Sequence, residues 1–360
     1  MRSLSLLLLL FVAAPAFAQE ALHRQKGQSA QAPPPVPAAA APAPAARPAG
    51  GDPILHVTDF INARPEFQAS LEAFARRSEE TPPLLYGAAG KTSETYDIGD
   101  TRMFKVYNYE KSGASIVMDD IQFTLKAETP RFLLWVETAE LNSGQVQDSD
   151  VESLRAAMMD RTPAGSVNPS AGIIVNNETL FGTPPDVDGN GKTDILLVDV
   201  RDGWTPGNGY IGGFVFSPDV TDADPGDANH QYSNGRDILY LDTKPALNGT
   251  STVGIEGTAA HEYQHLIHLA YDTREETFVN EGLSEWAEIA NGYYNRDITY
   301  LGKVSEHNTP LFAWRSNDVE DPNLVLNDYE RAGLFTTYIA ERIGAAATGR
   351  IVQAANAQGF

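Results

Sequence analysis

The sequence predicts an α+β protein, because strand-like segments come first along the folded part and helix-like segments follow. Four strand candidates lie between residues 171 and 243. From about residue 255 to Phe360 the apolar residues recur at helical spacing. The sequence H-E-x-x-H, at residues 261–265, stands near the start of this helical part. These observations predict a twisted sheet, then a helix that bears a metal site, then a helical lobe.

The first 51 residues are expected to lie outside the folded protein. Arg2, an apolar run over 4–14 and Ala16-Phe17-Ala18 have the order of a signal peptide, which we predict to span 1–18. Residues 19–51 are predicted to be a linker rich in proline and alanine. The protein is therefore expected to be secreted, either to the extracellular space or to the periplasm.

Composition narrows the class of partner. The formal net charge is -22 at pH 7, so the chain should repel nucleic acid and anionic membranes. No later apolar stretch is long enough to insert into a bilayer. The chain has no cysteine, so stability outside the cell must come from the core or from bound metals. We expect a monomer that acts on protein or peptide substrates.

The folded part is predicted to divide near residue 150. Residues 52–150 are interpreted as a small β-rich N-terminal domain, and residues 151–360 as the catalytic domain. In the first, a helix is expected at 66–77 and strands at 102–110 and 131–140. In the second, a helix is expected at 150–160, and strands at 171–177, 193–200, 211–217 and 236–243.

The sequence His261-Glu262-Tyr263-Gln264-His265 predicts a zinc site. Histidines four residues apart on a helix lie on one face, so both imidazoles can reach the same ion. Zinc binds such nitrogens at about 2.0–2.1 Å. Glu262 directly follows a ligand, so its carboxylate can reach a water on the metal without binding the metal itself. We therefore expect Glu262 to act as a general base.

A third ligand is expected in the stretch "NEGLSEWAE", residues 280–288. Glu281 is the candidate, at the start of a second helix that Gly292 closes. The alternative for Glu281 is a helix-start glutamate favoured by the helix dipole. Glu285, one turn further, is predicted to orient a histidine ligand, whereas Glu288 is interpreted as solvated. His268 is expected to be a packed or partly exposed helix residue.

These motifs resemble those of a known group of enzymes. "HEYQH" followed by "NEGLSEWAE" looks like the gluzincin metallopeptidases. The stretch from "DVDGNGKTDILLVDV" onward is more narrowly similar to the hyicolysin-like family of secreted bacterial neutral metallopeptidases. The resemblance implies zinc, peptide hydrolysis and a two-lobed zincin-like domain, with His261, Glu262, His265 and Glu281 in the corresponding roles. Members of that family usually continue further, so a longer natural chain than one ending at Phe360 stays open.

Two further features are assigned to the substrate cleft. A helix is predicted over 327–344, with Asn327 and Glu330 as a capping pair and Tyr329 in its first turn. The Tyr329 phenol could stabilise the oxyanion, although a tyrosine packed against its neighbours is equally compatible, and His230 and His307 are rivals. In zincins an edge strand pairs with the substrate, so Ile238 and Tyr240 are expected to line the cleft.

An acidic loop predicts a second metal. Asp186, Asp188, Asn190 and Asp194 stand at positions 1, 3, 5 and 9 of a pattern like an EF-hand loop, with glycine at position 6. Position 12 is Leu197 instead of glutamate, and the loop leads into a strand. We therefore predict calcium bound in a site of non-EF type, with a simple turn of Asp, Asn and Gly residues as the alternative.

The sequence thus favours a secreted zinc-dependent endopeptidase. One alternative is a secreted, calcium-stabilised binding or adhesion protein whose zincin-like site is inactive. The intact Glu262 speaks against this, because an inactive site often loses its base. The other alternative is an aminopeptidase, whose usual motif for the substrate amino group is not visible in this sequence.

Overall fold

The computed structural model describes residues 54–80, 94–206, 209–247, 253–293, 308–315 and 322–354. The predicted signal peptide and linker lie outside these residues. The strands are β1 (Ile54–His56), β2 (Thr101–Tyr107), β3 (Met118–Glu128), β4 (Phe132–Glu137), β5 (Thr193–Val198), β6 (Tyr210–Phe214) and β7 (Ile238–Asp242). The helices are α2 (Thr58–Asn62), α3 (Pro65–Glu80), α4 (Thr138–Ser143), α5 (Asp148–Met159), α6 (Ile173–Phe181), α7 (Pro218–Thr221), α8 (Val253–Tyr271), α9 (Thr277–Ala290), α10 (Pro322–Ile343) and α11 (Ala345–Gly349), and a 3-10 turn, η4, spans Arg350–Gln353.

The strands form one mixed sheet in the order β1-β6-β7-β5-β4-β3-β2. β4, β5 and β7 run parallel, and β2, β3 and β4 form an antiparallel meander beside them. β6 is antiparallel to β7, and β1 pairs parallel with β6 at the sheet edge. Strands from both sides of residue 150 therefore share one sheet, so the expected domain boundary falls within a single sheet of the described residues.

Each face of the sheet carries its own apolar core, because alternate residues of a strand point to opposite faces. In β4, Leu134 and Val136 pack toward the helices α5, α6, α8 and α9. Leu133 and Trp135 instead join a second core with Phe67 of α3. The metal-site motif belongs to α8, so it lies on the first of these faces.

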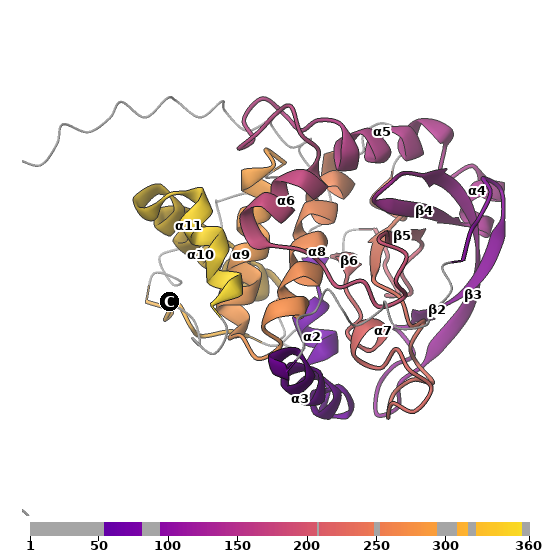
Figure 1. Ribbon diagram of the computed structural model, residues 1–360, viewed down its shortest axis with the longest axis horizontal. Helices are drawn as coiled ribbons and strands as arrows, with labels where there is room; N and C mark the ends of the chain where they lie inside the picture. The colour runs from indigo at the N-terminus through magenta and orange to yellow at the C-terminus, as the bar shows by residue number, and fades with distance from the viewer. Residues whose placement is uncertain are drawn as a thin grey trace, which may run out of the picture. The chain divides into compact units, whose positions relative to one another are not determined.

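The helical lobe consists of α8, α9 and α10, which Figure 1 shows next to one another on one side of the sheet. Glycine allows α9 and α10 to approach closely: a Cβ on Gly282 would lie 2.7 Å from Thr336 Oγ1 and 3.1 Å from the carbonyl oxygen of Ala332. This contact fixes the position of α9, the helix that carries Glu281. None of the helices in the described ranges combines the length and apolarity that a bilayer span requires.

Three local predictions were wrong. The segment 171–177 is not a strand, because α6 begins at Ile173 and runs to Phe181. α6 is short and mostly buried, although Val175 and Thr179 are exposed, and a short apolar run does not distinguish a buried strand from a buried helix by its period. Glu281 lies in the second turn of α9 instead of opening it. α10 starts at Pro322, so Asn327 and Glu330 are interior helix residues, and Tyr329 is not in the first turn.

Candidate metal centre

Three side chains converge between α8 and α9. The Nε2 atoms of His261 and His265 lie 3.1 Å apart. Glu281 Oε2 is 3.2 Å from His261 Nε2 and 3.3 Å from His265 Nε2. All three side chains are buried. The two histidines come from one face of α8 and the glutamate from the facing side of α9, so packing of the two helices brings the ligand atoms together.

The Nδ1 atom of each imidazole has a hydrogen-bond partner, and this partner determines the role of the Nε2 atom in the same ring. His261 Nδ1 lies 3.1 Å from Glu288 Oε1, and His265 Nδ1 lies 3.1 Å from Asn280 Oδ1. Both partners are acceptors, so each Nδ1 carries a proton, and each Nε2 is the nitrogen that can bind a metal when it is deprotonated. Two imidazole nitrogens and a carboxylate oxygen therefore face one position, which a metal cation could occupy.

The geometry fits zinc. Ligands at about 2.0–2.1 Å in a tetrahedral arrangement stand about 3.3–3.4 Å from one another. The three observed separations of 3.1, 3.2 and 3.3 Å are close to this value. Two imidazoles and one carboxylate also form a donor set of catalytic zinc sites, which leave a fourth position open.

The charge distribution supports a cation here as well. Burial alone would lower the pKa of His265, but the charge of Glu281 and a hydrogen bond with it raise that pKa to about 10. Burial would raise the pKa of Glu281, yet the two histidines hold it well below its usual range. Without a metal this positive charge is a proton on His265, and a metal held by the Nε2 atoms and Glu281 would take the place of that proton.

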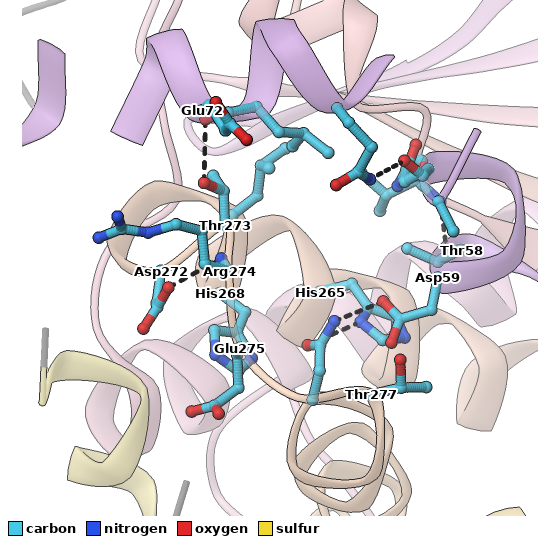
Figure 2. A pocket seen from close by; sticks show the side chains of 17 residues that line it. Thr58, Asp59, Glu72, His265, His268, Asp272, Thr273, Arg274, Glu275 and Thr277 are labelled. Carbon is cyan, nitrogen blue, oxygen red and sulfur yellow. Dashed lines mark hydrogen bonds between the residues drawn. The ribbon is translucent and has the colours of Figure 1, made fainter. Parts of the chain in front are cut away.

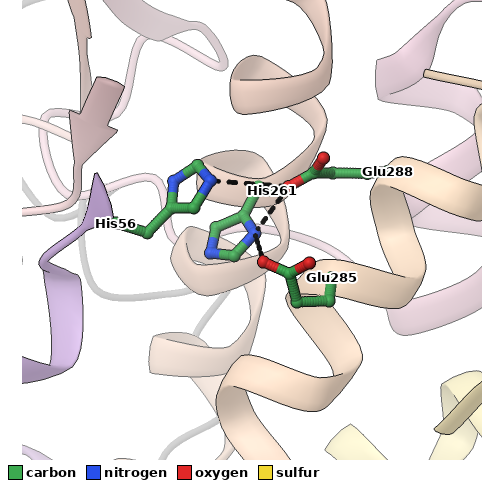
Figure 3. Close-up of side chains that lie close together, drawn as sticks. All are labelled: His56, His261, Glu285 and Glu288. Carbon is green, nitrogen blue, oxygen red and sulfur yellow. Dashed lines mark hydrogen bonds and ion pairs between the residues drawn. The ribbon is translucent and has the colours of Figure 1, made fainter. Parts of the chain in front are cut away.

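Figure 3 shows the glutamates behind His261. Glu288 Oε1 is the nearer partner of His261 Nδ1, whereas Glu285 Oε1 lies 3.7 Å away. The sequence analysis gave the orienting role to Glu285 and interpreted Glu288 as solvated. Glu288 is in fact only 1% exposed, because the face of α9 that bears it packs against α8. Glu288 therefore orients His261, and Glu285 lies beside this pair.

Glu262 has partners that the sequence did not reveal. Its Oε1 lies 3.0 Å from His56 Nδ1, and its Oε2 accepts a hydrogen bond of 2.7 Å from Thr58 Oγ1. Burial would raise the pKa of Glu262, but the hydrogen bond with His56 and the charges of His261 and His265 lower it. The carboxylate is therefore held ionised, the state in which it can accept a proton.

Tyr329 also lies at this site. It is buried, and its hydroxyl donates a hydrogen bond to the backbone carbonyl oxygen of His56. The same hydroxyl lies 3.5 Å from Glu281 Oε1. Of the predicted rivals, His230 contacts the backbone of Asp222, away from this cluster, and His307 lies outside the described residues. The structure therefore brings Tyr329 to the metal cluster.

The N-terminal segment supplies side chains that sequence reasoning missed. The His56 ring stacks on that of His261, with centroids 3.7 Å apart. Asp59 accepts a hydrogen bond of 2.6 Å from Asn280 Nδ2. These residues stand more than 200 positions before His261 and belong to no motif, and the parallel pairing of β1 with β6 brings them to the site.

A cavity of about 530 Å³ opens beside the cluster. Thr58, Asp59 and His265 are among the residues that line it (Figure 2). Burial lowers the pKa of His268, also on its wall, to about 3, so this ring is neutral. The cavity reaches the metal cluster only at His265, and Thr58, Asp59 and Asn62, which follow β1, form part of its wall.

The predicted cleft residues of β7 lie elsewhere. β7 is an inner strand between β6 and β5, not an edge strand, and Ile238 and Tyr240 are buried. Both side chains belong to the core on the face opposite α8. At the end of the sheet nearest β7, β1 is the edge strand, and it covers the edge of β6.

The acidic loop forms a different cluster from the one predicted. Asp186 and Asp188 gather with Asp237, which the sequence analysis did not select. Asp194 is buried and accepts hydrogen bonds from Trp135 Nε1 and Arg236. Asn190 Nδ2 donates to Asp188, and Arg236 lies 3.0 Å from Asp188. This cation already neutralises part of the cluster, so calcium at this loop stays a prediction.

Comparison with known proteins gives one informative similarity. No protein-family model matches the chain. Over 172 aligned residues the chain is 27% identical to neutral metalloprotease ShpI of Staphylococcus hyicus. The aligned region covers 44% of this chain and 37% of that relative. The match thus spans little more than a third of that relative's length. At this distance the similarity supports a relationship to metallopeptidases.

Proposed function

We propose that the protein is a secreted zinc-dependent endopeptidase. The convergence of His261 Nε2, His265 Nε2 and Glu281 Oε2 at tetrahedral spacing carries this proposal. The distant similarity to a neutral metalloprotease supports peptide bonds as the substrate. Secretion rests on the signal-peptide pattern of residues 1–18.

Each residue of the site has a distinct task in this proposal. His261, His265 and Glu281 would hold zinc, which when bound supplies a water of lowered pKa and polarises the scissile carbonyl. Glu262 takes the proton of the attacking water and delivers it to the leaving amine. The Tyr329 hydroxyl, which can donate to a carbonyl oxygen at this position, stabilises the developing oxyanion.

The metal itself can be tested without any assay of activity. Elemental analysis of the purified protein should give one zinc per chain, and the His261→Ala/His265→Ala double variant should contain almost none. Calcium in the buffer should not replace the lost zinc, because imidazole is a poor ligand for calcium. Full zinc occupancy of the double variant would place the metal elsewhere.

The Glu262→Gln substitution tests the chemistry. Glutamine keeps the size of the side chain but cannot take up a proton, so cleavage of an internally quenched peptide should fall by about 10²–10⁴-fold. Zinc content should stay near the wild-type value, because Glu262 is not a ligand. Cleavage at the wild-type rate would show that another group is the base.

A further inference from the structure

We propose that residues 54–59 form an internal inhibitory segment that occupies the peptide-binding path of the site. The proposal rests on the peptidase function given above and concerns how that activity is regulated. Three groups that a substrate would need are each engaged by this segment: the edge of β6, the carboxylate of Glu262 and the hydroxyl of Tyr329.

The first of these groups is the edge of β6. β1 pairs with it through Ile54↔Tyr210, Leu55↔Ile211 and His56↔Gly213. After β1, side chains in place of backbone groups form hydrogen bonds with the stretch that follows β6. Thr58 Oγ1 accepts a hydrogen bond of 2.9 Å from the Val215 amide, and Asn62, three residues beyond the segment, bonds to the backbone of Val215 and Ser217. An extended peptide binds by adding a strand to such an edge, so β1 takes the place of a bound peptide.

The second and third groups are the catalytic ones. Both carboxylate oxygens of Glu262 are in hydrogen bonds with the segment, one with His56 and one with Thr58. A general base must lie within hydrogen-bond reach of the proton that it removes. Tyr329 donates its hydroxyl to the carbonyl oxygen of His56, which is a main-chain carbonyl like that of a substrate. The segment thus binds as a peptide would, with its own side chains against the base.

The rival explanation is that His56 is a permanent catalytic residue. A catalytic histidine would need only its contact with Glu262 and would leave the strand edge and the tyrosine open to substrate. Here one short segment takes up all of these groups, and its Asp59 reaches across to Asn280, the partner of His265. The joint occupation favours inhibition.

Gly212 offers a way to displace β1 without altering the metal ligands or Glu262. A Cβ at Gly212 would lie 2.6 Å from Ile54 Cγ2, a separation that real Cβ atoms do not tolerate. Its next contacts, with Thr258, begin at 3.4 Å. Gly212→Ala should therefore push Ile54 off β6. The double variant Gly212→Ala/Ile54→Ala removes the clashing methyl group and should let β1 return, which makes it a matched control.

The experiment compares four full-length proteins: wild type, Gly212→Ala, the double variant and His56→Ala. Each is measured for kcat/KM on a quenched peptide, for zinc content and for hydrogen–deuterium exchange of residues 210–217. For Gly212→Ala we expect faster exchange and kcat/KM higher by on the order of tenfold, the change that loss of one good contact makes in a two-state equilibrium. His56→Ala should also gain activity, and the double variant should return toward wild type.

Three outcomes of these measurements would overturn the inhibition proposal. A loss of activity in His56→Ala with zinc retained would make His56 catalytic and overturn the proposal. Unchanged exchange in Gly212→Ala, or faster exchange without a gain in kcat/KM, would overturn it as well. If every protein holds zinc, exchange shows β1 displaced and nothing is cleaved, the peptidase function itself fails, and the inhibition proposal is withdrawn with it.

Discussion

His261 uses both ring nitrogens, and this double engagement explains why a carboxylate stands behind it. Nε2 faces Glu281 at the candidate metal position, and Nδ1 is held by Glu288. A carboxylate partner fixes the orientation of the ring and makes the imidazole a stronger ligand. The residue behind a ligand therefore contributes to affinity for the metal without touching it.

Replacing Glu288 with glutamine should lower zinc affinity by about 10–100-fold, the usual effect of losing such a partner. Competition with a chelator of known affinity measures this change. Glu285→Gln serves as the control. Because Glu285 lies further from His261 Nδ1, this substitution should lower zinc affinity less than Glu288→Gln does. Equal effects of the two substitutions would contradict the assignment of Glu288 as the orienting residue.

For single residues, the sequence predicts the contacts between positions that are close along the chain. It does not predict contacts between positions that are far apart along the chain. Helix geometry predicts that His261 and His265 share one face of α8, and Glu281 was selected from the glutamate-rich stretch that follows; the structure brings these three together. Helix phase alone did not separate Glu285 from Glu288, because the choice depends on which face of α9 meets α8. His56 could not be found, since its proximity depends on the pairing of β1 with β6, strands that lie more than 150 residues apart in the sequence.

Among the elements, α6, α8 and α9 are tied together by buried amides. Asn291 Nδ2 donates to Asn177 Oδ1 at 2.7 Å, and Asn176 Nδ2 donates to Asn291 Oδ1 at 3.1 Å. Asn177 Nδ2 in turn donates to the carbonyl oxygen of Ala260, the residue before His261. This network holds the metal-binding part of α8 against the end of α9.

Asn291→Ala should lower the free energy of unfolding by about 1–3 kcal/mol, because it leaves buried amide groups without partners. Urea unfolding followed by circular dichroism measures the loss. Asn142→Ala, on the exposed side of α4, is the matched control and should change stability by less than about 0.5 kcal/mol. A neutral result at Asn291 would mean that water satisfies the freed groups.

The same network shows why α6 was predicted as a strand. Its first residues, Ile173, Ile174 and Val175, are β-branched, which favours a strand when only local preference is considered. The two asparagines that follow are buried and point into the amide network, and helical geometry lets both reach their partners. Tertiary hydrogen bonding thus overrides the local preference.

For the whole molecule, buried carboxyl groups make stability depend on pH. Burial raises the pKa of Asp219 to about 7, despite hydrogen bonds from Tyr240 and Asn234. The folded state therefore binds this proton more tightly than the unfolded state, whose pKa is near 3.8. The resulting stabilisation is complete below about pH 4 and is lost as pH rises through about 7.

Asp219→Asn should remove this part of the pH dependence, which amounts to about 4 kcal/mol at most. Free energies of unfolding measured between pH 5 and pH 8 should decline less steeply in the variant than in the wild type. Asparagine can still accept the Tyr240 hydrogen bond, so the fold should be kept. Parallel curves for the two proteins would show that Asp219 does not titrate in this range.

The position of β1 also bears on the order in which the chain folds. β2, β3 and β4 pair with their neighbours in sequence, but Ile54 meets Tyr210 only after a loop of more than 150 residues is closed. Closing long loops costs entropy and slows the contacts that depend on them. As an edge strand, β1 can join a sheet that is already assembled. The first strand along the chain is therefore expected to be the last to fold.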